Sequence, residues 1–368
     1  MRDADHEYSG PAGDLAKAAE GAFVAGDTAK AAKLFEQLTQ ENPDNFRFLF
    51  NLGSCLANLG NHAAAIVAYK QALQRNPLEA DTLYFLGLSY LDCNLPEDAE
   101  KFFTCCLSVD PAYVRVHGGL ARAAMQLGKM EQAIASYRKA LDSEADRETA
   151  AHMLAALCGE KTERAPARYV QSLFDDYASC FEQSLTGIGY NIPWKLRSLF
   201  DNLFGRAKRF QNALDLGCGT GLSGSAFYDL TERMVGIDLS ARMLREAEEK
   251  GIYDHLEQQD LVTYLKECGE FFDLFLLTDV LVYLGHLTDL FRAIGRRALP
   301  QALLLFSVEK GDGAGYQLRP TGRYAHSRQY LEDLAYGNGF EIEACRATGI
   351  RKENEKWIEG EIYILSRP

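Results

Sequence analysis

One repeating pattern organises the N-terminal part of the chain and constrains its fold more than any other feature of the sequence. Prolines recur every 34 residues, at Pro43, Pro77 and Pro111. An alanine followed four positions later by an aromatic ring recurs with the same period, at Ala31 and Phe35, Ala65 and Tyr69, Ala99 and Phe103, and Ala133 and Tyr137. This pattern predicts a stack of helical hairpins, because one hairpin cannot bury its apolar face alone.

The pattern resembles the tetratricopeptide repeat, whose L-G-x-x-Y element is matched at Leu52-Gly53 and again at Leu86-Gly87. We expect about four repeats, followed by an additional helix over residues 147–157 that covers the last hairpin. Gly53 and Gly87 should let the two helices of a hairpin approach, with a ring from the second helix filling the space between them.

The resemblance implies a concave groove that binds an extended protein or peptide partner. The side chains expected to face it are Arg47, Asn51, Ser54, Tyr84, Leu88, Arg115 and Arg122. Three arginines there suit an acidic peptide or a carboxylate. Two other interpretations stay open, a solvated surface and self-association of the chain into a homo-oligomer.

A second feature dominates the C-terminal part, the stretch Asn212-Ala-Leu-Asp-Leu-Gly-Cys-Gly-Thr-Gly221. Its apolar residues run into a glycine cluster, and an amphipathic segment follows. That order predicts a buried strand, a tight turn and the start of a helix. Glycines allow unusual backbone dihedrals and a close approach of the backbone to a ligand, and the helix N-terminus offers free N–H groups.

Two registers of glycines overlap in this stretch. Gly219, Gly221 and Gly224 fit the G-x-G-x-x-G dinucleotide fingerprint, in which the first glycine should follow the strand directly. Gly217, Gly219 and Gly221 fit the G-x-G-x-G turn of S-adenosylmethionine (SAM) binders. We favour the SAM register, because Gly217 and Cys218 precede the first glycine of the other one and Asp215 would repel a pyrophosphate.

With these glycines, residues 212–368 resemble a class I SAM-dependent methyltransferase, and the whole chain resembles bacterial methyltransferases fused to tetratricopeptide repeats. The fold class implied is α + α/β. An all-α repeat superhelix precedes a Rossmann-like domain of seven strands, in which a parallel sheet ends in a C-terminal antiparallel hairpin. Two apolar segments, 340–350 and 357–365, suit that hairpin.

The expected organisation has five parts. They are a flexible N-terminus at 1–11, the repeats at 12–158, a charged linker at 159–166, a helical lid at 167–204 and the methyltransferase domain at 205–368. Tyr177 and Tyr190 in the lid are candidates for contact with cofactor or substrate. The alternative is a place in the core, where an aromatic residue at helical spacing more often lies.

Composition argues against nucleic-acid-binding, membrane and secreted proteins. The formal net charge of −13 disfavours non-specific binding of nucleic acid or an anionic membrane. There is no apolar run of membrane-spanning length, and the first residues lack the apolar core of a signal peptide. The nine cysteines form no C-x-x-C pair and show no metal-ligand spacing. These features predict a cytoplasmic protein with reduced thiols and no metal.

Most of the cofactor contacts are expected where strands meet the loops after them. Asp238 ends an apolar strand about twenty residues past the glycines, as a ribose-binding carboxylate should. The resemblance implies that Leu239 and Met243 pack beside the adenine and that Asp260, with Leu261, contacts its amino group. The full expected set is Asp215, Gly217, Gly219, Gly221, Asp238, Leu239, Met243, Asp260, Leu261, Thr278 and Tyr177.

The chemistry of methyl transfer needs alignment of a nucleophile more than acid–base catalysis, because the sulfonium is already activated. If a base is used, His286 and His326 are candidates, since they follow the fourth and fifth strands. Tyr283, Glu309 and Arg323 are candidates for orienting the substrate. For each of these residues a surface or structural role is the alternative.

The function expected is SAM-dependent transfer of a methyl group to an oxygen, nitrogen or carbon nucleophile. The repeats would recruit a protein partner or substrate, or mediate assembly. The alternatives are a small-molecule methyltransferase or other SAM-binding enzyme whose repeats only oligomerise, and a non-catalytic SAM-binding scaffold.

Overall fold

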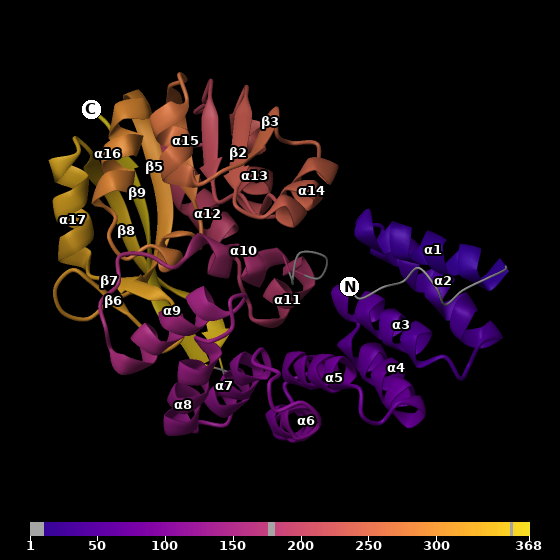
Figure 1. The fold of residues 1–368 in the computed structure, drawn as a ribbon. Helices are drawn as coiled ribbons and strands as arrows, with labels where there is room; N and C mark the ends of the chain where they lie inside the picture. The colour runs from indigo at the N-terminus through magenta and orange to yellow at the C-terminus, as the bar shows by residue number, and fades with distance from the viewer. Residues whose placement is uncertain (1–10, 176–180, 354–355) are drawn as a thin grey trace. The chain divides into compact units, whose positions relative to one another are not determined.

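The computed structural model describes residues 11–175, 181–353 and 356–368 of the chain. The chain divides into two compact units, Met1–Leu154 and Ala155–Pro368, which are drawn in Figure 1. Each unit is described by itself below. The five-part division expected from the sequence stays a prediction. Two expectations lie outside the described residues, residues 1–10 of the flexible N-terminus and the candidate contact Tyr177.

The first unit is helical, and from α1 to α8 each helix packs against the next along the chain. Turns that contain the repeating prolines separate successive hairpins. The helices are α1 (Pro11–Val24), α2 (Thr28–Glu41), α3 (Phe46–Asn58), α4 (His62–Arg75), α5 (Ala80–Asp92), α6 (Pro96–Val109), α7 (Val116–Gln126), α8 (Met130–Ala140) and the start of α9 (Arg147–Cys158).

The repeated spacing of small and aromatic residues within the chain has the structural cause expected of it. A methyl group placed on Gly53 would lie 2.7 Å from the ring of Tyr69, and one on Gly87 would lie 2.5 Å from the ring of Phe103. Both rings are buried. The absence of a side chain at each glycine therefore sets the helix–helix distance, and the ring fills the interface.

The second unit is a mixed sheet with helices on both faces (Figure 1). Five parallel strands run in the order β3-β2-β1-β4-β5, and β9 pairs antiparallel with β5 and with β8. Their bounds are β1 (Ala213–Leu216), β2 (Met234–Asp238), β3 (His255–Gln258), β4 (Phe272–Leu277), β5 (Ala298–Lys310), β8 (Glu341–Glu353) and β9 (Lys356–Ser366). The expected Rossmann-like sheet and its C-terminal antiparallel hairpin are confirmed.

The central strands are apolar throughout because both faces of the sheet are covered. Along β4, Phe275 and Leu277 pack on one face, while Leu274 and Leu276 pack on the other. The first face carries α15 (Leu261–Glu267), α16 (Thr288–Arg297) and α17 (Arg328–Gly337). The second carries α12 (Ile192–Phe204), α13 (Leu222–Phe227) and the short helix η2 (Tyr228–Leu230).

The sheet has a short hairpin in addition to the seven expected strands. Strands β6 (Tyr316–Leu318) and β7 (Tyr324–His326) pair antiparallel, and β7 pairs parallel with the end of β5. Glu309 on β5 is paired with Gly360 of β9 and with Ala325 of β7, so these two strands lie on opposite sides of β5. Because β4 ends opposite Phe306, β7 lies beyond the carboxyl end of β4.

The remaining helices of this unit are α10 (Ala167–Asp175), α11 (Phe181–Gly187), α14 (Ala241–Glu249) and the short helix η3 (Leu281–Tyr283). The first two precede the sheet in the chain, and η3 follows β4. Among the described residues, the helices are too short or too polar to cross a membrane.

Candidate functional site

A pocket opens at the carboxyl edge of the parallel strands, where open α/β sheets bind their ligands. It encloses about 1010 Å³ of empty space, its open mouth included. Its walls come from the glycine turn after β1, the ends of β2, β3 and β4, the helices α10 and α11, and the segment before α10. We call the part formed by β1, β2 and β3 the cofactor end, and the part formed by α10, α11, Tyr190 and the end of β4 the acceptor end.

The glycine turn brings bare backbone to the pocket. Gly217 and Gly219 line it, and both have positive φ, 74° and 54°. A methyl group on Gly217 would lie 2.5 Å from Val280, whereas one on Gly219 would meet no atom within 4 Å. Position 217 therefore requires glycine for two reasons, the close packing against Val280 and the positive φ. At Gly219 the missing side chain leaves the backbone open to a ligand.

Asp238 ends β2 at the floor of the cofactor end. Its Oδ2 accepts a hydrogen bond from the Gly219 N–H at 2.9 Å, and its Oδ1 accepts one from the Ser240 N–H at 2.8 Å. Burial raises the pKa of this carboxyl group, and the two backbone N–H groups act in the opposite direction. A half-buried carboxylate that lines a pocket and still has acceptor capacity suits a ligand with neighbouring hydroxyl groups.

Asp260 follows β3 and begins α15, accepting from the Thr263 N–H at 3.0 Å. Its other oxygen lies 3.3 Å from the guanidinium of Arg164. Gln259, Leu239 and Leu261 line the same part of the pocket. The site thus offers apolar surfaces and polar groups in the same pocket as Asp238.

The helices α10 and α11 are tied to the cofactor end by side-chain hydrogen bonds. Glu182 on α11 accepts from the Thr220 hydroxyl of the glycine turn at 2.8 Å and pairs with Lys250 at 2.5 Å. Asp175 at the end of α10 accepts from the Ser240 hydroxyl at 2.5 Å. These contacts hold apolar side chains of both helices over the pocket.

The segment between α9 and α10 is built into the pocket wall. The Ala165 N–H donates to the carbonyl of Tyr283 at 2.9 Å, and the N–H groups of Gly285 and His286 donate to the carbonyl of Glu163, each at 2.8 Å. Arg164 and Ala165 both line the pocket. The stretch expected to be a linker therefore contributes backbone pairing and side chains to the site.

Aromatic rings form much of the acceptor end. Phe174 lies edge-on to Tyr283 with ring centroids 5.5 Å apart, and to Phe181 at 5.9 Å. Tyr190 lines the pocket beside them. Burial raises the pKa of both phenols, so each keeps its proton and can donate a hydrogen bond.

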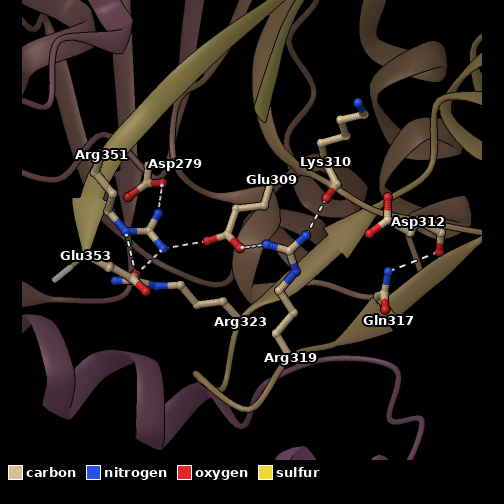
Figure 2. A network of polar contacts seen from close by, with 9 residues as sticks. All are labelled: Asp279, Glu309, Lys310, Asp312, Gln317, Arg319, Arg323, Arg351 and Glu353. Atoms are coloured by element: carbon tan, nitrogen blue, oxygen red, sulfur yellow. Dashed lines mark hydrogen bonds and ion pairs between the residues drawn. The ribbon is translucent and has the colours of Figure 1, made fainter. Parts of the chain in front are cut away.

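Behind the acceptor end lies a network of ion pairs, shown in Figure 2. Arg351 on β8 is buried and lies 2.5 Å from Glu309, 2.9 Å from Glu353 and 3.5 Å from Asp279. Arg323 pairs with Glu353 at 2.8 Å and Arg319 with Glu309 at 3.3 Å. Three guanidinium groups thus balance three carboxylates.

Asp279 connects this network to the pocket. It lines the pocket directly after β4, and its φ of 58° is uncommon for a residue with a side chain. Its N–H donates to the Ser307 hydroxyl at 2.9 Å. Backbone strain held by surrounding contacts is typical of functional positions.

The structure brings together eight of the residues expected at the site. Those that line the pocket are Gly217, Gly219, Asp238, Leu239, Asp260, Leu261, Thr278 and Tyr283. Thr278 is also hydrogen-bonded to Ser223, with the two hydroxyl oxygens 2.5 Å apart. Tyr190 joins them from the lid.

Three expected cofactor contacts lie elsewhere than on the pocket surface. Asp215 is fully buried and accepts from the Tyr253 hydroxyl at 2.7 Å, and burial raises the pKa of its carboxyl group to about 7. Gly221 begins α13, and Met243 is buried in α14. None of these three residues lines the pocket.

The two candidate histidines do not line the pocket. His286 is exposed and lies 3.2 Å from the Thr288 hydroxyl. His326 is buried, its Nε2 donates to the carbonyl of Leu284 at 2.8 Å, and burial lowers its pKa to about 4. A neutral ring that holds the Leu284 loop has a structural role here. Glu309 and Arg323, expected to orient substrate, belong to the ion-pair network instead.

Several residues of the site escaped sequence reasoning. Asp279 is absent from the expected set although its neighbour Thr278 belongs to it, and Arg164 is covered only by the charged linker expected at 159–166. The signal for Asp279 was its place after a continuously apolar strand. No local signal marks Arg164, because its role depends on pairing with Tyr283–His286, more than a hundred residues away.

Comparison with known families agrees with this architecture. Residues 16–70, 80–113 and 103–158 match family models described as tetratricopeptide repeat, and residues 213–301 match one described as methyltransferase domain. The chain therefore carries tetratricopeptide repeats in its first part and a methyltransferase domain in its second.

Curated relatives match only a small part of the chain. Residues of this chain are 36% identical over 84 positions to tetratricopeptide repeat protein 21B of Xenopus laevis, covering 22% of this chain and 6% of that protein. They are 28% identical over 87 positions to the Saccharomyces cerevisiae protein named essential for maintenance of the cell wall protein 1, covering 24% and 10%. The chain spans about a tenth or less of the length of these relatives.

Solved structures similar to this chain include a SAM-dependent methyltransferase from Methanosarcina mazei, 17% identical with a TM-score of 0.37, over 46% of this chain and 96% of that one. Another is magnesium protoporphyrin IX methyltransferase from Synechocystis with bound SAH, 18% identical with a TM-score of 0.41, over 54% and 99%. Likenesses this distant say nothing about what this chain acts on.

Proposed function

We propose that the chain binds SAM and transfers its methyl group to an acceptor held at the other end of the same pocket. The observation that carries the proposal is the convergence of the Gly217–Gly219 backbone, Asp238 and Asp260 on one pocket at the carboxyl edge of the sheet. The methyltransferase-domain match over residues 213–301 supports it independently.

The residues present fit such a cofactor. Asp238 keeps acceptor capacity for two ribose hydroxyls, and Asp260 and Gln259 offer polar contacts for an adenine between Leu239 and Leu261. Gly219 leaves room for the amino-acid part of the ligand at the turn. A pyrophosphate fits poorly, because carboxylates from Asp238, Asp260 and Asp279 line the pocket and would repel it.

Bound SAM supplies a methyl group that a sulfonium already activates. The chain's own residues then have three tasks. The glycine turn and Asp238 fix the position of the cofactor, the aromatic rings of α10, α11 and η3 exclude water, and Asp279 with the Tyr190 and Tyr283 hydroxyls orients the acceptor. Neither candidate histidine is needed as a base in this arrangement.

The repeats are proposed to recruit a protein partner or substrate. Of the side chains expected in their groove, Arg122 is paired with Asp92 at 3.1 Å and the Arg115 guanidinium lies over the Tyr84 ring at 5.1 Å. Such contacts hold cationic groups in fixed places, which supports recognition of an acidic segment. Self-association through the repeats, with a small-molecule acceptor, is the alternative use.

Calorimetric titration tests the cofactor proposal. Wild-type protein should bind SAM and S-adenosylhomocysteine at micromolar concentrations and show no comparable affinity for NAD. Asp238→Ala should lose the binding, while Asp289→Ala, which removes an exposed carboxylate on α16, should keep it. Tighter binding of NAD would overturn the proposal in favour of a dinucleotide site.

A further inference from the structure

The carboxylate of Asp279 is the polar group at the acceptor end that is best placed to receive a ligand. Its Oδ1 faces Arg351 at 3.5 Å, and its N–H is fixed by Ser307. Among the described residues, no hydrogen bond engages its second oxygen. One carboxylate oxygen of Asp279 is held by Arg351, and the residue's left-handed backbone is strained. The second oxygen can therefore accept a hydrogen bond from a ligand.

The walls around Asp279 suit a cation. Phe174, Phe181, Tyr190 and Tyr283 line this end of the pocket. The faces of aromatic rings attract ammonium groups electrostatically, and the attraction grows when water is excluded. Two of the four rings also carry phenols that keep their protons.

The charge of the pocket lining also favours a cation. Among the described residues that line it, the charged ones are Arg164, Asp238, Asp260 and Asp279. Arg164 is paired with Asp260, so Asp238 and Asp279 give the surface a negative balance. The guanidinium groups of Arg351 and Arg323 interact with Asp279 from behind without lining the pocket, so the negative balance belongs to the pocket surface and not to the whole ion-pair network.

We propose that the methyl acceptor is an amine, bound as an ammonium group against Asp279 and the surrounding rings. The inference rests on the proposed methyltransferase function and deepens it by naming the class of acceptor. A carboxylate acceptor would be repelled by Asp279. A phenol or alcohol carries no positive charge for the Asp279 carboxylate and the ring faces to attract.

The proton and charge balance of this reaction is simple. The ammonium held against Asp279 loses one proton to solvent and leaves a nitrogen with a free electron pair. The nitrogen–methyl bond forms as the carbon–sulfur bond of the cofactor breaks, and the positive charge moves from sulfur to nitrogen. The methylated ammonium again donates to Asp279 while it lies among the rings.

Three small probes of one size separate cation, neutral donor and anion. Butylammonium, butan-1-ol and butanoate are titrated at pH 7 into the full chain loaded with S-adenosylhomocysteine, and binding is followed by ligand-observed NMR. We expect butylammonium to bind roughly tenfold more tightly than butan-1-ol, with butanoate weakest. Asp279→Asn should reduce the preference for the cation roughly fivefold or more.

The variants keep the test interpretable. Asparagine tolerates the left-handed backbone at position 279, so Asp279→Asn should fold, and a thermal melt checks this. Asp289→Asn is the matched control, because it removes a carboxylate that lies outside the pocket lining, and it should leave all three affinities unchanged. Equal binding of the three probes, no binding of any, or preference for butan-1-ol or butanoate would overturn the amine proposal. Failure to bind S-adenosylhomocysteine would instead overturn the proposed function.

Discussion

The two ends of the pocket are constructed differently. The cofactor end consists of backbone and side chains from one continuous stretch, residues 217–261, at the ends of three adjacent parallel strands. The acceptor end is assembled from residues 164–175 and 181–190, the loop after β4 and, behind it, side chains of β5, of β8 and of the turn between β6 and β7. The first is local in sequence, whereas the second depends on pairing between distant segments.

Because of this difference, substitutions at the two ends should have different effects. At the cofactor end, the backbone dihedrals of the glycine turn and the Asp238 carboxylate position the cofactor. Changes there should therefore alter ligand binding directly. At the acceptor end a buried ion-pair network holds Asp279 in place, so changes in the network should first appear in stability. The predictions below are ordered from the largest expected effect to the smallest.

Removing Arg351 should be the most destabilising change. Arg351→Met leaves Glu309 buried with its closest cationic partner gone, and breaking a buried pair from one side costs about 3–5 kcal/mol. Chemical denaturation should show this loss in the free energy of unfolding. Arg292→Met, at an exposed pair on α16, is the control and should cost less than about 1 kcal/mol. Similar losses in both variants would show that the network does not hold the acceptor end.

Asp215 should give the cofactor end a pH-dependent stability. The pKa of its carboxyl group is about 7 in the folded protein and about 3.8 when unfolded, so the folded state binds the proton more strongly. Stability from this group is therefore present at low pH and is lost as the pH rises from about 4 to 7.

Asp215→Asn removes that titration. The variant should gain stability relative to wild type as the pH rises through this window, by about 2–4 kcal/mol in total. Urea titrations at pH 4.5, 6 and 7.5 measure the difference. A difference that stays constant across these values would show that the buried carboxyl group does not titrate there.

A pair of glycine substitutions separates packing from backbone strain. Gly217 and Gly205 both have positive φ, 74° and 72°, but only a methyl group at Gly217 meets a neighbour. Gly205→Ala should cost about 1 kcal/mol, and Gly217→Ala about 1–3 kcal/mol more together with the loss of S-adenosylhomocysteine binding. If both variants lower the melting temperature equally and both still bind S-adenosylhomocysteine, the glycine turn does not position the cofactor.

Arg164→Ala should have the smallest effect. Its pair with Asp260 is half exposed, and such pairs contribute less than about 1 kcal/mol. We expect the dissociation constant of S-adenosylhomocysteine to rise by less than about fivefold. A larger rise in calorimetry would place Arg164 in direct contact with the cofactor.

The sequence predicted the cofactor end better than the acceptor end for a physical reason. Gly217, Gly219 and Asp238 follow strands directly, so their place at the sheet edge follows from strand order alone. His326 also follows a strand, yet β7 lies beyond β4 and places its ring in a buried layer under the Leu284 loop. Neither the β6–β7 hairpin nor the pairing of Glu163 with Gly285 leaves a local pattern in the sequence.

The repeats show the same contrast within one unit. The close approach at Gly53 and Gly87 could be predicted because each ring lies at a fixed offset in the same period. The contact of Phe103 with Gly119, where a methyl group would lie 2.5 Å from the ring, joins two successive hairpins and has no counterpart in the repeating motif. Periodicity thus reveals contacts within a repeat more readily than contacts between repeats.

The most direct test of the central claim is a side-by-side titration of S-adenosylhomocysteine into wild type, Asp238→Ala and Asp279→Asn. If the pocket has separate cofactor and acceptor ends, wild type and Asp279→Asn should bind with affinities within about threefold of each other, and Asp238→Ala should lose at least a hundredfold, or about 2.7 kcal/mol. Equal loss in both variants, or no binding by the folded wild-type chain, would contradict the account.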